Sequence, residues 1–249
     1  MRSPLLFTST PIFSSYDLPL HGSSNMLTTP TIKPTLFPSS PFRLFPTTHL
    51  STRCIFKRSL DIVGSIVGLL ILAILFIPIA IAIKLDSPGS IIYRQKRCGL
   101  RGRPFTIYKF RTMVNNADAL KSEIQNEASG AIFKNKNDPR ITRVGRFLRR
   151  TSLDELPQFW NVLVGKMSLV GTRPPSFDEV IYYSDRHWCR LNVKPGITGE
   201  WQVNGRSVVN DFEQIVTLDL RYQKRWSLWY DLWLILKTIW VVITRQGAF

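Results

Sequence analysis

The chain has 249 residues, of which 44% are hydrophobic, enough to build the core of one large or two small domains. Lysine and arginine number 33 against 17 acidic residues, so the formal net charge is +16. A surface of this charge attracts polyanions such as nucleic acid, anionic lipid headgroups or nucleotide phosphates. The three cysteines are far apart and odd in number, which argues against a disulfide framework and a structural zinc site and favours a reducing compartment. With only three histidines, little material exists for histidine-based metal or triad chemistry.

Residues 1 to 53 are rich in serine, threonine and proline, contain a single acid, Asp17, and show no sustained apolar period. We therefore predict a disordered tail. Its composition is similar to that of an organelle transit peptide, which would direct the protein to a plastid. A bacterial tail or a start site placed too far upstream would have the same composition, so all three interpretations stay open.

Residues 54 to 87 form the most apolar part of the chain. The 22 residues from Ile62 to Ile83 carry no charge, and a helix of that length can cross about 30 Å of hydrocarbon. Pro78 removes a helical hydrogen bond and favours a kink. Basic residues flank both ends, and such flanks tend to remain cytoplasmic. We therefore predict a bent, re-entrant helix at the cytoplasmic face of a membrane, with a spanning helix as the alternative.

Residues 88 to 249 contain several short elements. The segment 88–113 holds two β-prone runs joined through glycines and predicts a hairpin. Arg143–Arg150 has the pattern of a basic amphipathic helix. Four of the seven tryptophans lie at helical spacing between Trp226 and Trp240, which favours a helix at a membrane interface. The predicted fold class is α+β and mostly helical, with a re-entrant membrane helix, a small cytosolic domain and interfacial amphipathic helices.

The adjacent acids Asp154 and Glu155 lie between two clusters of cationic side chains. Ser152 and Glu155 have the spacing of a helix capping box, which is the common role of this pattern. If Asp154 were the N-cap instead, Pro157 would fit within the first helical turn. In either register the acids lie at a helix N-terminus, where the partial positive charge favours their ionised forms. These residues alone leave both a capping role and a reaction centre open.

Motifs elsewhere in the chain decide between these roles. In chain order they are Lys57–Asp61, Tyr108–Met113, Asp138–Arg140, Ser152–Gln158, Met167–Gly171, and Lys194–Gly199 with Asn204–Arg206. Together they resemble the bacterial sugar transferases, the monotopic polyprenyl-phosphate phosphoglycosyl transferases, over residues 55 to 249. The chain resembles the minimal catalytic form of that family, and its Gly199–Arg206 segment is similar to cyanobacterial members that initiate exopolysaccharides.

The resemblance implies an enzyme that transfers a phosphosugar from a UDP-sugar to polyprenyl (undecaprenyl) phosphate, releasing UMP and initiating exopolysaccharide or other glycan synthesis. Asp154 would be the nucleophile that forms a covalent phosphosugar intermediate, and Glu155 its partner. Both acids would hold Mg²⁺, a hard cation that binds carboxylates together with substrate phosphates. The partners implied are the UDP-sugar and membrane lipid, including anionic headgroups, but not nucleic acid. The sugar and the oligomeric state are not predicted.

An anion that attacks a diphosphate needs cations to offset the accumulated charge. Arg149 lies five residues before Asp154, and Arg173 lies in a Gly-Thr-Arg-Pro loop that resembles the phosphate-binding loop of the family. The planar guanidinium of arginine can hold two phosphate oxygens. Further candidates for phosphate binding are Lys194, Arg206, Lys109 and Arg111.

Two other functions are compatible with parts of the sequence. A membrane-bound basic adaptor without catalysis would account for the charge and the amphipathic helices, but not for an acid pair enclosed by arginines. A Mg²⁺-dependent phosphohydrolase would use the same acids to activate water.

Overall fold

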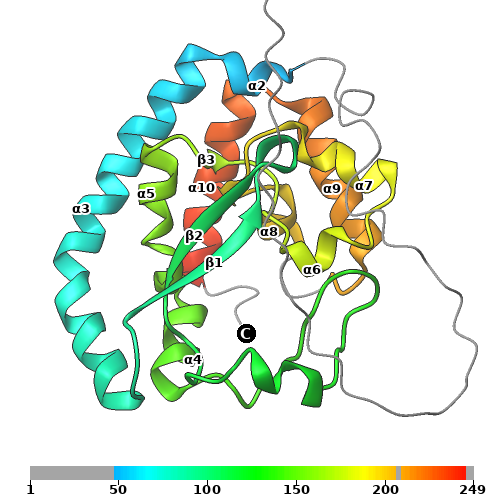
Figure 1. Ribbon diagram of the computed structural model, residues 1–249. Coiled ribbons are helices and arrows are strands. Elements are labelled where there is room, and N and C mark those ends of the chain that lie inside the picture. The colour runs from blue at the N-terminus through cyan, green and yellow to red at the C-terminus, as the bar shows by residue number, and fades with distance from the viewer. Residues whose placement is uncertain (1–47, 206–208, 245–249) are drawn as a thin grey trace, which may run out of the picture. The chain divides into compact units, whose positions relative to one another are not determined.

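The computed structural model describes residues 48–205 and 209–244, and all of them belong to one compact unit, Thr35–Phe249 (Figure 1). The helices are α2 Leu50–Arg53, α3 Ile55–Asp86, α4 Arg143–Arg150, α5 Gln158–Leu163, α6 Phe177–Val180, α7 Asp185–Cys189, α8 Glu200–Gly205, α9 Phe212–Arg225 and α10 Leu228–Thr244. The strands are β1 Ile92–Cys98, β2 Pro104–Phe110, β3 Ser168–Val170 and β4 Gly196–Thr198. Short 3-10 turns are η1 Leu100–Gly102, η2 Ala119–Glu123, η3 Leu153–Glu155 and η4 Arg190–Asn192. This mixture confirms the predicted α+β class.

Helix α3 contains the predicted apolar segment as one continuous 32-residue helix with Pro78 inside it. Its ribbon changes direction in the C-terminal half (Figure 1), as expected where proline removes a backbone hydrogen bond. Among the described residues, it is the helix long and apolar enough to cross a membrane. Large apolar side chains along its outer face are exposed: Ile55, Phe56, Val63, Ile66, Val67, Leu70, Ile71, Ile74, Phe76, Ile77, Ile81 and Leu85. The re-entrant topology stays a prediction.

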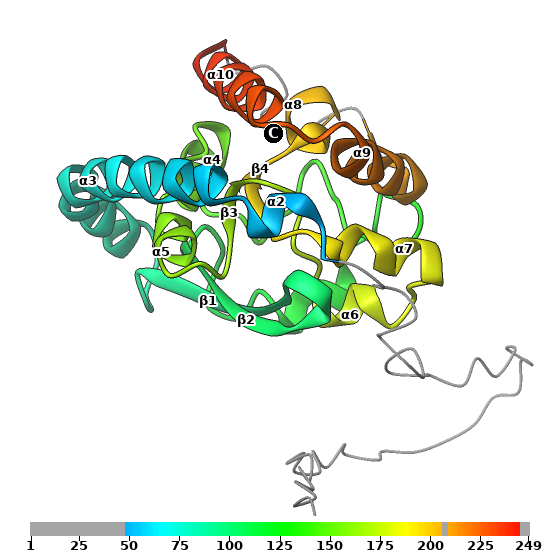
Figure 2. The same ribbon diagram turned by 90° about the horizontal axis from the view of Figure 1, so that it is seen from above.

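The inner face of α3 packs closely on α5, which lies between α3 and the β1–β2 hairpin (Figure 2). Gly68 of α3 makes this approach feasible, and Gly64 allows the same close approach to Leu169 of β3. A Cβ atom at Gly68 would lie 2.3 Å from the ring of Phe159, and one at Gly64 would lie 2.5 Å from Leu169. Helix α3 therefore contributes to the same core as the rest of the domain.

The predicted hairpin is confirmed. Strands β1 and β2 pair antiparallel with Tyr93 opposite Lys109 and Arg97 opposite Phe105. Arg101, with a φ of 54°, and Gly102, with a φ of 74°, reverse the chain between them. Burial of Phe105 fixes one face of the hairpin against the core.

The central core surrounds a two-stranded parallel sheet in which Ser168 of β3 pairs with Gly196 of β4. Helices α3, α5 and α10 all contact β3. Val162, Met167 and Leu234 are fully buried there. The short strand β3 is thus the point where the long apolar helix, the segment after the acid pair and the C-terminal helix meet.

A buried ion pair joins α3 to α10. The Lys57 ammonium lies 2.6 Å from Asp231 Oδ2 and donates to the Val170 carbonyl of β3 at 3.1 Å. Asp231 also accepts hydrogen bonds from the Tyr222 hydroxyl at 2.8 Å and from the Trp226 indole at 3.0 Å. Because these polar groups satisfy one another, a buried charge pair is tolerated at this position.

The predicted helix at the C-terminus is confirmed as α10, and it has two different faces. Asp231 and Leu234 are buried, whereas the opposite face exposes apolar side chains. The exposed ones are Trp229, Leu232, Trp233, Leu236, Ile239, Trp240, Val242 and Ile243.

The predicted tail boundary at residue 53 is wrong for its last residues. Residues 50–53 form α2, and Ser51 is buried. His49 Nε2 lies 3.0 Å from the carbonyl of Gln223 at the C-terminal end of α9, which fixes this segment to the domain. Residues 1–47 of the predicted tail lie outside the described residues.

Replacing Lys57 by Met should lower the free energy of unfolding by about 3–5 kcal/mol, because it leaves the buried Asp231 carboxylate without its counter-charge. The matched control is Lys84→Met, which changes an exposed lysine of the same helix and should cost less than about 1 kcal/mol. Denaturant unfolding in detergent measures both. Equal losses would show that the buried pair does not hold the two helices together.

Candidate functional site

Asp154 lies in the 3-10 turn η3 and is only 4% exposed. The turn leads through Leu156 to Pro157, which is the N-cap of α5. The capping box that the spacing left open does not form: Ser152 is the residue before η3, but it has a φ of 56°, in the left-handed region, and its side chain makes no cap hydrogen bond. A serine that caps a helix through its hydroxyl normally has an extended backbone, which Ser152 lacks. The acid pair is therefore held by a tight turn rather than by a cap.

Glu155 faces a cation from the hairpin. Lys109 of β2 donates to Glu155 Oε1 at 2.9 Å, and both side chains are partly exposed. The predicted candidate Lys109 is thus located at the acid pair. The antiparallel register that places Lys109 opposite Tyr93 determines which face of the hairpin meets η3.

Arg149 also lies beside this turn, at the end of α4. Its Nε donates to the Thr112 hydroxyl at 2.9 Å, which ties α4 to the segment after β2. Gly145 permits the close approach of α4, since a Cβ there would lie 2.0 Å from the Thr112 carbonyl oxygen. The predicted basic amphipathic helix is confirmed in position, with Leu148 buried and Phe147 exposed.

A buried pair, Asp138 and Arg140, lies close enough to Arg149 for its charge to act on Asp138. Arg140 donates to both oxygens of Asp138, at 2.9 and 2.7 Å, and to the Ala117 carbonyl at 3.0 Å. Burial acts to raise the pKa of Asp138, but the hydrogen bonds and charge of Arg140, with the charge of Arg149, lower it overall. Sequence reasoning assigned no role to this pair, although it lies in one of the recognised motifs.

Arg173 belongs to a second cluster of charges. It donates to both oxygens of Glu179, at 2.6 and 3.0 Å. Arg97 of β1 donates to the Pro174 carbonyl at 3.1 Å and lies 3.4 Å from Glu179. Burial acts to raise the pKa of Glu179, yet the charge and hydrogen bonds of Arg173 lower it to about 2. Burial and the neighbouring Arg173 lower the pKa of Arg97 to about 10.

One face of β1 connects the two clusters. Tyr93 lies opposite Lys109, and the charges of Arg97 and Arg140 both act on it. Between Tyr93 and Arg97, Gln95 accepts a hydrogen bond of 2.9 Å from Arg97 Nε. Four residues of strand span about 13 Å, so the acid pair and Arg173 lie at opposite ends of one polar strip. The sequence contained no signal for Arg97 or Glu179, because nothing local links them to the loop of Arg173.

Two other predicted phosphate ligands lie elsewhere, and a third is outside the described residues. Arg111 is buried and donates to the carbonyls of Ser87, at 2.6 Å, and Pro88, at 2.7 Å, where it caps the C-terminal end of α3. Lys194 lies near Arg58, beyond the opposite end of α5 from Asp154. Arg206 lies outside the described residues.

The donor chemistry of the acid pair fits Mg²⁺. In residues 48–205 and 209–244, no group of three or more His, Cys, Asp or Glu side chains converges as a metal site. Mg²⁺ is the cation that commonly uses only one or two carboxylates and takes its remaining ligands from water and substrate phosphates. Asp154 and Glu155 could therefore hold it together with a bound diphosphate.

Comparison with known proteins agrees with this arrangement of motifs. The model of the bacterial sugar transferase family matches residues 52–245. The chain belongs to the bacterial sugar transferase family. It is 50% identical over 194 residues to the galactosyl transferase CpsE of Streptococcus agalactiae, covering 77% of this chain and 43% of that protein. It is 47% identical over 199 residues to the undecaprenyl-phosphate galactose phosphotransferase of Salmonella typhimurium, covering 78% and 41%.

The chain thus spans less than half the length of these relatives. A shorter relative matches over most of its length: the exopolysaccharide production protein ExoY of Rhizobium meliloti is 39% identical over 199 residues, 78% of this chain and 88% of that protein. The recognised motifs and all the site residues named above fall within the residues that the family model matches.

The Glu179 cluster should make the stability of the fold sensitive to acid. Because the pKa of Glu179 is about 2 in the fold against an ordinary 4.5, its contribution is complete above pH 4.5 and lost as the pH falls toward 2. The loss should be on the order of 3 kcal/mol. The Glu179→Gln variant should have a lower free energy of unfolding than the wild type at pH 7. Between pH 4.5 and pH 2, that free energy should fall less steeply in the variant than in the wild type. The control Asp178→Asn, an exposed neighbour, should retain the wild-type slope; identical slopes in all three proteins would contradict the assignment.

Proposed function

We propose that this chain transfers a phosphosugar from a UDP-sugar to a polyprenyl phosphate, undecaprenyl phosphate in bacteria, and so initiates assembly of an exopolysaccharide or another glycan. The observation that carries the proposal is the buried Asp154 beside Glu155, flanked by Lys109 and Arg149, in a member of this family. Two relatives support the same class of reaction by their names. One is an undecaprenyl-phosphate galactose phosphotransferase, and the other is a UDP-glucose:undecaprenyl-phosphate glucose-1-phosphate transferase.

In the first step, a carboxylate oxygen of Asp154 attacks the β-phosphorus of the UDP-sugar. A bond forms between that oxygen and phosphorus, the diphosphate P–O bond breaks, and UMP leaves with the electron pair. In the second step, a phosphate oxygen of the polyprenyl phosphate attacks the same phosphorus. The Asp–phosphorus bond breaks, the carboxylate is regenerated, and polyprenyl diphosphate sugar is the product.

The cations have separate roles in this proposal. Lys109 and Arg149 offset the charge that accumulates when a carboxylate meets a diphosphate, and Lys109 also orients Glu155. Arg173 and Arg97, at the far end of the polar strip, hold the nucleotide or sugar part of the donor, since the strip of about 13 Å suits an extended ligand. Asp154 and Glu155 bind Mg²⁺, which would supply further neutralisation of phosphate charge when bound.

The exposed apolar faces of α3 and α10 support a location at a membrane. Both faces expose many large apolar side chains, and contact of such a surface with water is unfavourable. Tryptophans such as Trp229 and Trp240 prefer the headgroup region of a membrane. We place α3 as a re-entrant helix in the leaflet of the cytoplasmic face, with α10 at the interface.

Replacing Asp154 by Asn should abolish the phosphosugar adduct and reduce UMP release at least about 10³-fold, because the amide is a poor nucleophile. Intact-mass spectrometry after incubation with a UDP-sugar detects the adduct, and UMP is assayed with Mg²⁺ and polyprenyl phosphate. The control Asp185→Asn removes an exposed carboxylate of α7 and should behave as wild type. Wild-type turnover in the Asp154 variant would exclude it as the nucleophile.

The same assay separates the alternative functions. A phosphohydrolase would release UMP without the lipid at the full rate, and a non-catalytic adaptor would release none under any condition. The proposed transferase gives one UMP per adduct without lipid and sustained release only when polyprenyl phosphate is present.

The re-entrant topology predicts that both ends of the domain face the cytosol. Tags placed at Leu50 and at the C-terminus should be accessible only from the cytosolic side, measured by labelling of intact and permeabilised cells. Accessibility from opposite sides would establish that α3 spans the membrane.

A further inference from the structure

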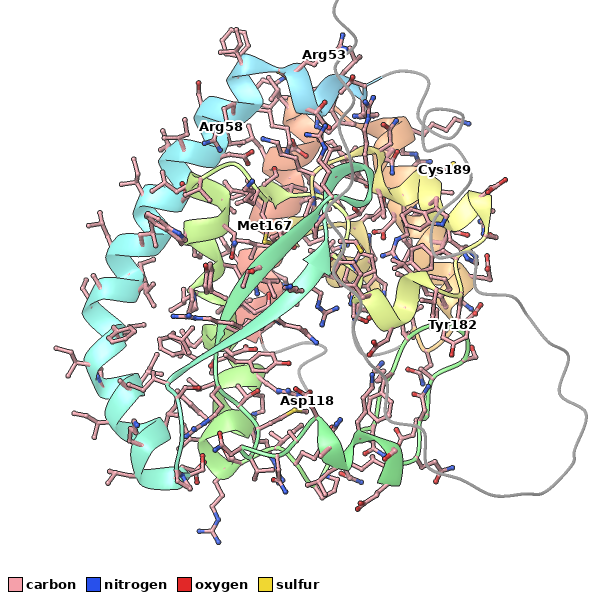
Figure 3. All side chains as sticks on the ribbon, in the orientation of Figure 1. Arg53, Arg58, Asp118, Met167, Tyr182 and Cys189 are labelled. Carbon is pink, nitrogen blue, oxygen red and sulfur yellow. The ribbon has the colours of Figure 1, made fainter. Side chains whose placement is uncertain are left out.

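A turn with two neighbouring cations follows α5. Gly165 has a φ of 79°, and a Cβ atom built on it would lie 3.7 Å from Arg58 Cζ and 3.8 Å from Lys194 Nζ. Arg58 comes from the N-terminal part of α3 (Figure 3), whereas Lys194 lies just before β4. Three segments that are distant in sequence therefore bring two positive charges to the same small space.

The charges around this turn are not balanced. The Arg58 guanidinium donates to the Val162 and Leu163 carbonyls, at 2.8 and 2.6 Å, which fixes its position. Asp61, one turn along α3, is already engaged by the Ser168 hydroxyl at 2.8 Å and the Leu169 N–H at 2.9 Å. Among the described residues, no carboxylate lies within ion-pair distance of Arg58 or Lys194.

The pKa of Lys194 is affected by the neighbouring cation. Burial, and then repulsion by Arg58, lower the pKa of Lys194, and the charge of Asp61 offsets them only in part. An anion between Lys194 and Arg58 would relieve this repulsion. The arrangement therefore has the electrostatics of an anion site.

Exposed apolar side chains lie near the turn in the sequences of α5 and α3, and the exposed Lys166 follows Gly165. Val164 directly precedes Gly165 and is 46% exposed, and Trp160 one turn earlier is 51% exposed. Ile55 and Phe56, at the start of α3 near Arg58, are also exposed. An anionic lipid could pair its phosphate with the cations and bury the exposed apolar side chains against its acyl chains. A free anion could only pair with the cations.

This turn is separate from the reaction site. The acid pair precedes α5 and Gly165 follows it, and the six residues of α5 alone span about 9 Å. A phosphate held at the turn is therefore not the phosphate that reacts at Asp154.

We propose that Arg58, Lys194 and the Gly165 turn bind the phosphate of an anionic membrane phospholipid. The lipid phosphate lies between the two cations, and its acyl chains follow the exposed side chains of α5 and α3. This binding seats the domain on the membrane at a point away from the reaction centre, and it does not depend on the proposed transfer reaction.

The first test uses the full chain in detergent, with thermal unfolding followed against added dioleoylphosphatidylglycerol or dioleoylphosphatidylcholine. The anionic lipid should stabilise the wild type, and the zwitterionic lipid should not. Lys194→Gln should weaken the apparent Kd for the anionic lipid about tenfold, as expected for one charge-assisted contact. Lys194→Arg should retain binding. Lys224→Gln removes the same charge from an exposed position of α9, and its apparent Kd should match that of the wild type. Equal weakening in the Lys194 and Lys224 glutamine variants would show only general surface attraction and overturn the proposal.

A second pair of variants fills the site. Gly165→Asp places a carboxylate between the two cations, and Gly165→Asn places a neutral side chain of the same size; both residue types tolerate left-handed backbone. The Asp variant should be the more stable of the two without lipid, and both variants should lose stabilisation by phosphatidylglycerol because their side chains occupy the space of the phosphate. If both variants keep the wild-type response to the lipid, the turn is not the binding site.

Two further additions identify the ligand source. Inorganic phosphate alone should not reproduce the stabilisation, and if it does, the site takes a free anion and not a lipid. If undecaprenyl phosphate stabilises the protein through Lys194 and phosphatidylglycerol does not, the site holds the acceptor lipid and the phospholipid assignment is overturned.

Discussion

The buried ion pair between Lys57 and Asp231 is the constraint on which the rest of the domain depends. It joins residues 174 positions apart in sequence, and its hydrogen bonds reach the carbonyl of Val170 in β3. Separating α3 from α10 would leave a buried charge without its partner, which is strongly destabilising. The ion pair therefore holds both helices against β3. The two helices with the most exposed apolar surface are thereby fixed to the strand around which the core is built.

This attachment determines where the acids are presented. With α3 held at β3, where Gly64 packs on Leu169, Gly68 allows α5 to pack closely on α3, and the turn η3 before α5 is then placed against β2. The hairpin register delivers Lys109 to Glu155, and the far end of β1 delivers Arg97 to the Glu179 cluster. The acid pair thus obtains Arg149 from the helix just before it in sequence and Lys109 from a strand, 46 residues before Glu155. The anion site proposed at Gly165 uses the other end of the same α5.

Some of the site could be predicted from sequence because the signal was local. The acid pair and Lys109 each belong to a short motif, Arg149 lies five residues before Asp154, and Lys109 contacts Glu155 in the structure. Other assignments failed for a common reason. A basic residue in a motif can bind a phosphate or cap a helix, and only the fold showed that the Arg111 guanidinium is directed to the carbonyls of Ser87 and Pro88. The capping box failed because the spacing of Ser152 and Glu155 carries no information about the backbone angles of Ser152.

The sequence by itself determined the elements: a long apolar helix interrupted by Pro78, a hairpin, a basic helix and a tryptophan-rich helix, since each follows from composition and periodicity within one segment. It also determined the family, because motifs in a fixed order can be recognised without knowing the fold. The tertiary structure decided which charges meet. Ion pairs such as Arg97 with Glu179 and Lys57 with Asp231 depend on packing between segments far apart in the chain, and no local pattern records which partner a charged side chain will find.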